Sequence, residues 1–282
     1  MRFLIVGATG DVGSATVRTL LSSGDELRAL TRDPQRQEPA AGLEWRSFSF
    51  SPEPPPPELF AGVEGMLFIR PATVSDVPGL IEPFLRAAVA AGVGHIVFLS
   101  VLGADRIPFI PHYQIERLLT ELDCATDMLR ASFFMQNLTT VFGAWIRDAG
   151  ELVVPAGGGR TSFVDTRDIG EAAARILRRG ASGRQAWTIT GPAAISHAEL
   201  ARRMEQTFDV RIPYRRVGNR RFVREATARG WDRDYARFVS RIYLTVRFGL
   251  SRTVSADLES LLGRPATGID RFLADHRGQL LP

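Results

Sequence analysis

Short apolar runs alternate with amphipathic segments along the first 130 residues of the chain. The apolar runs lie at residues 3–6, 26–30, 43–48, 66–69, 95–99 and 126–129. Between them, residues 12–21, 80–91 and 113–122 carry apolar positions three and four apart, which is the spacing of one helix face. Strands that alternate with helices favour a parallel sheet covered by helices on both faces. The pattern therefore predicts an α/β fold with a doubly wound parallel sheet.

This alternation loosens after residue 130. Helices are predicted at 168–178 and 197–208, strands at 187–189 and 211–214, and mainly helix from about residue 219. An apolar stripe at helical spacing runs along Trp231, Tyr235, Phe238, Val239, Ile242 and Val246. We expect a first domain over residues 1–150, with sheet segments returning from about 160–192, and a smaller, mainly helical subdomain over residues 193–282.

A glycine motif follows the first predicted strand and opens the first predicted helix. It has the spacing G-x-x-G-x-x-G and reads Gly7-Ala8-Thr9-Gly10-Asp11-Val12-Gly13. Glycine permits a tight turn and a close approach of the backbone to a pyrophosphate, and the helix N-terminus presents free N–H groups to it. In this strand–turn–helix context the motif predicts a dinucleotide site that includes Gly7, Thr9, Gly10, Asp11, Val12 and Gly13.

The end of the second predicted strand indicates which dinucleotide the site prefers. An acidic residue there would bind the ribose 2′-hydroxyl of NAD. The strand ends instead in Thr31-Arg32, and arginine offers a planar fork to a 2′-phosphate. We therefore expect NADPH/NADP+ as the cofactor. Two features keep the alternative open: Asp33 follows directly, and Arg32 could be an ordinary surface side chain.

The composition excludes several chemistries. All 35 basic side chains are arginine, so the chain has no lysine for a Schiff base, a pyridoxal phosphate anchor or a P-loop. Four scattered histidines and the single Cys124 form no metal-ligand pattern, so no metal is predicted. A single cysteine also excludes an intrachain disulfide and fits a reducing cytoplasm. We see no signal peptide and no membrane span, and expect a cytoplasmic protein.

Positive charge is concentrated in one segment. Residues 201–250 hold 13 arginines against 5 acidic residues. Arg233, Arg237 and Arg241 are four apart, opposite the apolar stripe, which is typical of a solvated helix face. A basic segment could also meet nucleic acid or an anionic ligand. The solvated face is the favoured interpretation, so no nucleic-acid partner is predicted.

Several motifs together resemble the NmrA-like branch of the atypical short-chain dehydrogenase/reductases, which includes type-2 quinone oxidoreductases and triphenylmethane reductases. Besides the glycine motif, they are residues 95–100, His112-x-x-x-Glu116-Arg117, Leu129-Arg130, Phe133-Phe134-Met135-x-Asn137, Phe163-Val164-Asp165-x-Arg167-Asp168, Thr190-Gly191-Pro192 and residues 262–265. The resemblance covers nearly the whole chain. It implies a Rossmann-like domain that binds NADP(H) and a small C-terminal subdomain that covers the substrate cleft. The predicted helical segment 219–249 is a candidate lid, because it would bring arginine and aromatic side chains over that cleft.

The resemblance also suggests catalytic residues. Standard members of the superfamily use Ser, Tyr and Lys, with Tyr-x-x-x-Lys on one helix face. Ser100 ends the fifth predicted strand, as the family serine would, and Tyr113 and Arg117 have the four-residue spacing. Arg117 can place charge near Tyr113 and the cofactor but cannot relay a proton. The NmrA-like branch often shows a histidine here, which is His112, so the proton donor could be Tyr113, His112 or a water.

Ligands bind at the carboxyl ends of the strands in such sheets. By this rule Arg70-Pro71, Ser100 and Phe133 should flank the nicotinamide of the cofactor. A buried Arg70 would need a phosphate or carboxylate partner. A second set of apolar residues could form a wall for a flat aromatic substrate or belong to the core: Phe109, Phe133, Phe134 and Met135.

The sequence thus predicts an NADPH-dependent reductase that transfers hydride to a quinone or a polycyclic aromatic ketone, without the usual lysine. The alternative is a non-catalytic NADP(H)-sensing regulator of the NmrA type that binds a protein partner. A sugar-nucleotide epimerase is a third, weaker interpretation, since those enzymes usually keep both Tyr and Lys. A small aromatic carbonyl or quinone is the expected partner, and the oligomeric state is left open between monomer and homodimer.

Overall fold

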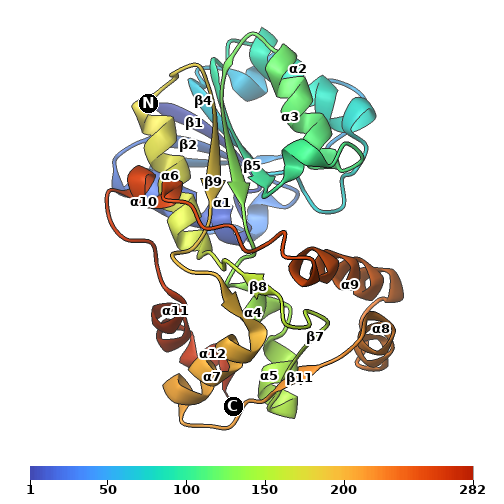
Figure 1. The fold of residues 1–282 in the computed structure, drawn as a ribbon. Coiled ribbons are helices and arrows are strands. Elements are labelled where there is room, and N and C mark those ends of the chain that lie inside the picture. Colours follow the sequence, from blue (N-terminus) through green and yellow to red (C-terminus); the bar gives the residue numbers. More distant parts are fainter. Residues whose placement is uncertain (282) are drawn as a thin grey trace. The chain divides into compact units, whose positions relative to one another are not determined.

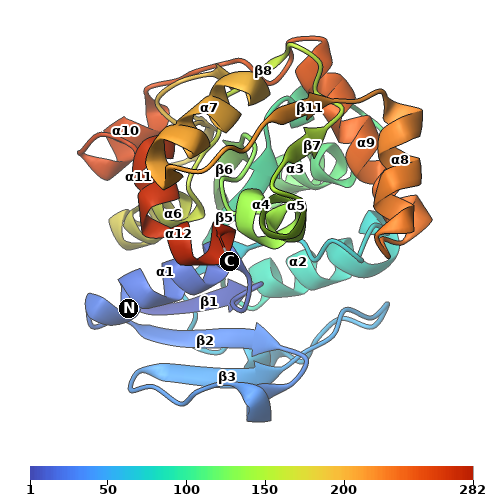
Figure 2. The ribbon, with the colours of Figure 1, turned by 90° about the horizontal axis from the view of Figure 1, so that it is seen from below.

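Seven parallel strands form one sheet in the computed structural model, which describes residues 1–281. They are β1 (Arg2–Val6), β2 (Glu26–Thr31), β3 (Leu43–Ser47), β4 (Gly65–Phe68), β5 (His95–Val101), β6 (Ala125–Ala131) and β9 (Arg184–Ile189). Their spatial order is β3-β2-β1-β4-β5-β6-β9, and Figure 2 shows β1, β2 and β3 side by side. The order reverses between β1 and β4, which is where a doubly wound sheet opens its ligand crevice. The predicted α/β class is confirmed.

Helices cover both faces of this sheet (Figure 1). They are α1 (Asp11–Ser22), α2 (Glu82–Ala90), α3 (Pro111–Glu121), α6 (Thr166–Arg179) and α10 (Asp257–Leu262). α1 packs closely on α6 because Gly170 has no side chain: a Cβ there would lie 2.5 Å from the Cβ of Ala15. α2 and α3 pack on an apolar core that includes Phe68, Phe84 and Phe98, all fully buried. The burial of these apolar side chains is the main force that holds helices to the sheet.

The chain divides into two units. The first contains the sheet and comprises Met1–Ala131, Thr166–Ile189 and Asp257–Arg264; the second comprises Ser132–Asp165, Thr190–Ala256 and the residues from Pro265 onward. The pattern of the sequence had suggested a boundary near residue 150, and sheet segments returning from about 160–192. In the structure two later segments, α6 with β9 and then α10, return to the first unit. No helix among the described residues is long and apolar enough to cross a membrane.

The second unit is mainly helical. Its helices are α4 (Asn137–Thr140), α5 (Gly143–Ala149), α7 (His197–Phe208), α8 (Asn219–Ala228), α9 (Arg233–Arg247), α11 (Ile269–Asp275) and α12 (Arg277–Leu280). Two short strand pairs complete it: β7 (Leu152–Val154) with β11 (Tyr214–Arg216), and β8 (Arg160–Thr161) with β10 (Ile195–Ser196). The strand predicted at 211–214 is therefore wrong by about three residues, because Pro213 lacks the N–H that a strand interior needs.

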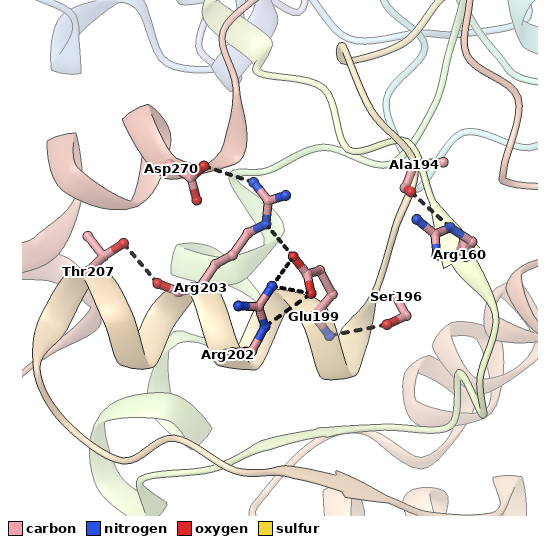
Figure 3. Close-up of polar contacts among 8 residues, drawn as sticks. All are labelled: Arg160, Ala194, Ser196, Glu199, Arg202, Arg203, Thr207 and Asp270. Atoms are coloured by element: carbon pink, nitrogen blue, oxygen red, sulfur yellow. Dashed lines mark hydrogen bonds and ion pairs between the residues drawn. The ribbon is translucent and has the colours of Figure 1, made fainter.

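Helix α7 shows how charged side chains are arranged in this unit (Figure 3). The Ser196 hydroxyl accepts a hydrogen bond from the backbone N–H of Glu199 at 3.1 Å and so caps the helix. The Glu199 carboxylate then accepts from the guanidinium groups of Arg202 and Arg203 on the next turn. Arg203 also reaches Asp270 on α11 at 2.8 Å. On α7, therefore, these two arginines have an acidic partner.

The helices α8 and α9 lie side by side (Figure 2). Asp232 caps α9 through the backbone N–H groups of Asp234 and Tyr235. The buried face of α9 consists of Ala236, Val239, Ser240, Tyr243 and Val246. The predicted apolar stripe is thus only partly correct: Val239 and Val246 are buried, but Tyr235 and Phe238 are 44% and 58% exposed. The buried face is rotated toward positions where small residues let the helix approach its neighbours.

Candidate functional site

The glycine motif forms a loop between β1 and α1. Gly7 has a φ of +83°, a left-handed conformation that glycine adopts without strain. The backbone N–H of Gly10 donates to the carbonyl oxygen of Gly7 at 3.1 Å and closes the turn. Gly10 is the N-cap of α1, and no side chain caps the helix. The first N–H groups of α1 are therefore left for another acceptor, and a phosphate is the acceptor that a helix N-terminus favours.

The third glycine, Gly13, makes this loop compact. A Cβ at Gly13 would overlap the carbonyl oxygen of Gly7 and lie 2.9 Å from the Cα of Ala8. A Cβ at Gly7 would lie 2.8 Å from the Cβ of Ile69 in the segment that follows β4. Both positions thus exclude any side chain, and the loop lies beside the switch point of the sheet. These residues fit the pyrophosphate of a dinucleotide.

Arg32, immediately after β2, is exposed, and it makes no hydrogen bond or ion pair within residues 1–281. The neighbouring Asp33 is engaged differently: its carboxylate pairs with the guanidinium of Arg36 at 3.0 Å. Both Arg32 and Asp33 could contact the ribose of the cofactor. Within residues 1–281 the Arg32 guanidinium is free, whereas the Asp33 carboxylate is paired. This arrangement fits a 2′-phosphate better than a bare ribose hydroxyl.

Arg70, after β4, is partly satisfied by backbone carbonyl oxygens. Its Nη1 lies within hydrogen-bonding distance of the carbonyl oxygens of Pro71, Ala72 and Val74, at 2.9, 3.3 and 2.7 Å. Burial lowers the pKa of Arg70, and its Nε atom is buried without a partner. Three carbonyl dipoles solvate Nη1 but leave Nε without a partner, so the expectation that Arg70 requires a phosphate or a carboxylate stays a prediction. Arg70 shapes the loop that begins with Pro71.

Ser100 lies near the end of β5 in a buried polar cluster. Its hydroxyl donates to the Glu116 carboxylate on α3 at 2.5 Å. Arg130, on β6, donates to the same carboxylate through Nε and Nη2, the latter at 2.7 Å. Arg130 also pairs with Asp105 at 3.2 Å. Because the Ser100 O–H already donates to the carboxylate, its oxygen is left only the role of an acceptor in this arrangement.

His112 is half-buried at the start of α3, one turn before Glu116. Its ring stacks on Phe98, with centroids 6.1 Å apart. Burial and, secondarily, the positive charge of Arg70 lower the pKa of His112 to about 4. At neutral pH the imidazole is therefore uncharged and can act as a hydrogen-bond donor or acceptor, but it is a poor proton source.

Tyr113 and Arg117 are four residues apart on α3, but their side chains differ in exposure. Tyr113 is half-buried, whereas Arg117 is exposed. The Tyr113 hydroxyl makes no hydrogen bond to the part of the chain that the structure describes, and no ion pair is formed there by Arg117. The phenol is thus available to a ligand.

The four residues of the expected apolar wall fall into different settings. Phe109 belongs to the first unit and is 83% exposed. Met135 is buried in the core of the second unit, and Phe133 packs against that core with its ring 5.8 Å from Tyr243. Phe134 is half-buried and lies in an isolated parallel bridge with Val164. Of the four, Met135 is a core residue.

A comparison with models of protein families identifies the family of this chain. The model of the NmrA-like family matches residues 1–229. The chain belongs to the NmrA-like family. The resemblance inferred from the glycine motif and the later sequence pieces is confirmed.

Individual relatives of this NmrA-like chain span its whole length. An NAD(P)H azoreductase of Xenophilus azovorans is 29% identical over 282 residues, which is 97% of each chain. The NADPH-dependent quinone oxidoreductase of Escherichia coli, solved with NADPH, superposes with a TM-score of 0.86 at 22% identity over 97% of this chain and 99% of its own. The triphenylmethane reductase of Citrobacter sp., solved with NADP(H), gives 0.83 at 22% identity over 98% and 99%.

The sequence patterns assigned no role in the site to Glu116 or Arg130, although both residues lie in motifs that carry the resemblance to the NmrA-like family. One signal could have found Glu116: it occupies the apolar face of α3 next to Ile115 and Leu119, where an acidic residue is buried only with a partner. Its partners come from β5 and β6, which periodicity alone does not bring together. Among the described residues no cluster of His, Cys, Asp or Glu could hold a metal.

Proposed function

We propose that this protein is an NADPH-dependent reductase whose substrate is a quinone or a polycyclic aromatic ketone. The observation that carries the proposal is the glycine loop at the switch point of the sheet, together with the unpaired Arg32 beyond the next strand. The full-length similarity to an NAD(P)H azoreductase and to a quinone oxidoreductase supports the same class of reaction.

The cofactor would be held by backbone and by one charge. The N–H groups at the start of α1 bind the pyrophosphate, and Gly7 and Gly13 keep the loop close enough to reach it. Arg32 forms a charged pair with the 2′-phosphate. NADPH supplies a hydride, and the protein supplies orientation and stabilisation of the charge that develops on the substrate oxygen.

The polar groups at the carboxyl end of β5 and at the start of α3 divide the remaining tasks. The Tyr113 hydroxyl is a free donor, and we assign to it the hydrogen bond to the developing oxyanion. The Ser100 oxygen accepts a hydrogen bond and does not donate one, because its O–H already donates to the Glu116 carboxylate. His112 is neutral above about pH 4 and orients the substrate through a neutral hydrogen bond. The proton that completes the reduction comes from Tyr113 or from a water.

Turnover with a panel of acceptors tests this proposal. The protein is mixed with NADPH and with quinones, polycyclic aromatic ketones and azo compounds, and the absorbance of the reduced nicotinamide is followed. We expect oxidation of NADPH with at least one quinone or ketone. Tyr113→Phe should lower kcat and leave the KM for NADPH unchanged. Tight NADPH binding without turnover across the panel would instead identify a regulator that senses the dinucleotide.

A further inference from the structure

A groove of about 860 Å³ runs between α8 and α9 in the second unit. Five arginines line it: Arg220 and Arg224 from α8, and Arg233, Arg237 and Arg241 from α9. No aspartate or glutamate is among its lining residues. All of its lining residues belong to one unit, so the groove is complete without the glycine loop of the other.

The arginines of this groove lack the partners that other arginines of the unit have. Arg220, Arg224, Arg233 and Arg241 make no ion pair within residues 1–281, and Arg237 contacts only Asp234, at the outer edge of α9. By contrast, Glu225 on α8 pairs with Arg221 and Arg215, which lie outside the groove. On α7, likewise, one carboxylate, that of Glu199, pairs with two arginines, Arg202 and Arg203 (Figure 3).

A solvated helix face usually mixes both signs of charge, because like charges four residues apart repel each other. Here Glu225 of α8 pairs outside the groove and Asp234 of α9 pairs with Arg237 alone, so four of the five groove arginines have no acidic partner among the described residues. The four-residue steps place the Cα atoms of neighbouring arginines about 6 Å apart along each helix axis, and the three Cα atoms of the α9 row span about 12 Å. Two such rows on facing helices form a cradle for an anion with several charges.

The other residues that line the groove indicate which kind of anion it can hold. Val223 and Leu244 contribute apolar surface between the arginine rows, and Asn219 and Ser240 contribute polar groups. The Asn219 amide donates to the Ser240 backbone carbonyl and so ties α8 to α9. A hollow of this volume, with an apolar floor and a few polar groups, is of the size that holds small molecules.

We propose that this groove binds a small organic polyphosphate. Guanidinium groups match the oxygens of phosphates in pairs, and the apolar floor accepts a ring or an aliphatic portion between them. The site lies in the second unit, and its lining residues include none of the residues assigned above to the reductase.

Calorimetric titration with tripolyphosphate, and then with ADP, tests the site. The glycine loop also binds phosphate, so the wild type should show two classes of site. The double variant Arg224→Gln/Arg237→Gln should lose one class, with an affinity for tripolyphosphate at least about tenfold weaker, since a hydrogen-bonded charge pair contributes roughly that factor. Gly13→Ala should lose the other class and keep the groove.

The matched control is Arg221→Gln, one residue from Arg220 on the same helix but outside the groove. It should bind tripolyphosphate as the wild type does, and the thermal unfolding of all variants should confirm that each is folded. Equal losses in Arg221→Gln and in the double variant would show a diffuse attraction of ions and overturn the proposal. Tighter binding of a short single-stranded oligonucleotide or of an acidic peptide than of tripolyphosphate, lost in the double variant, would also overturn it.

Discussion

At the scale of single residues, the glycine loop depends on the absence of one atom. The carbonyl oxygen of Gly7 occupies the place where a Cβ of Gly13 would lie. A side chain at Gly13 therefore has to push the loop outward, away from the first N–H groups of α1. Because these groups have no side-chain cap, their position relative to the loop decides whether a pyrophosphate can be bound.

We expect Gly13→Ala to weaken NADPH binding at the glycine loop at least about tenfold, the factor that 1.4 kcal/mol represents. The measurement is the fluorescence of the reduced nicotinamide in a titration. The control is Gly94→Ala, where no atom lies within 4 Å of the new Cβ and the backbone φ is ordinary. An unchanged affinity in Gly13→Ala would mean that the dinucleotide does not lie on this loop.

Arg32→Ala tests the choice of cofactor. The variant loses the cation that would face the 2′-phosphate, so the kcat/KM for NADPH should fall about tenfold or more. NADH lacks that phosphate and serves as the internal control, with a kcat/KM that stays near the wild-type value. A parallel decline for both cofactors would place Arg32 outside the 2′-phosphate site.

At the scale of elements, Glu116 connects α3 with two strands of the sheet. It accepts from Ser100 on β5 and from Arg130 on β6, and it is 5% exposed. The hydrogen bond raises the pKa of Arg130, which stays protonated throughout. Removing the carboxylate charge leaves a partly buried guanidinium with only Asp105, and it frees the proton of Ser100.

Glu116→Gln should lower the free energy of unfolding by about 2 kcal/mol, the usual contribution of a hydrogen-bonded charge. It should also lower kcat while the KM for NADPH is unchanged, because the polar cluster and not the phosphate loop is altered. Urea unfolding and steady-state kinetics measure the two effects. Glu121→Gln, exposed on the same helix, is the control, and a stability loss of equal size there would refute the assignment.

Local patterns predicted most elements of the first unit. Apolar runs gave β1 to β6 within a few residues, and the helix at 197–208 was predicted with the bounds that α7 has. Two features depend on contacts between distant segments and were not predictable in this way: the return of α10 to the sheet and the rotated buried face of α9. The same holds for the candidate site. The glycine loop is a motif of consecutive residues and was predicted, whereas the partners of Ser100 come from other elements and were not.

At the scale of the whole molecule, each unit has its own core. In the second unit His197 is fully buried among Phe163, Tyr214 and Tyr243, and neither ring nitrogen has a hydrogen-bond partner among the described residues. Burial lowers the pKa of His197 to about 3. The unfolded chain would bind a proton at this residue near pH 6.5, so it holds more protons than the folded chain between these two values.

Stability should therefore fall as the pH drops from about 6.5 toward 3. At pH 5 the loss from His197 alone is about 2 kcal/mol relative to neutral pH. His197→Phe keeps a flat ring and cannot be protonated, so its free energy of unfolding should depend less on pH over this window. Urea unfolding at pH 7 and pH 5 measures the difference. The same pH dependence in both proteins would show that His197 is not the responsible group.

The central claim is that the glycine loop holds NADPH for hydride transfer. A single-turnover experiment tests it most directly: the enzyme is loaded with NADPH deuterated at the transferred position and mixed rapidly with the fastest acceptor of the panel. We expect bound NADPH to be oxidised, more slowly when deuterated, and the amplitude of the reaction to fall in Gly13→Ala at an NADPH concentration near the wild-type Kd. Bound NADPH that no acceptor oxidises would show that the glycine loop does not hold NADPH for hydride transfer.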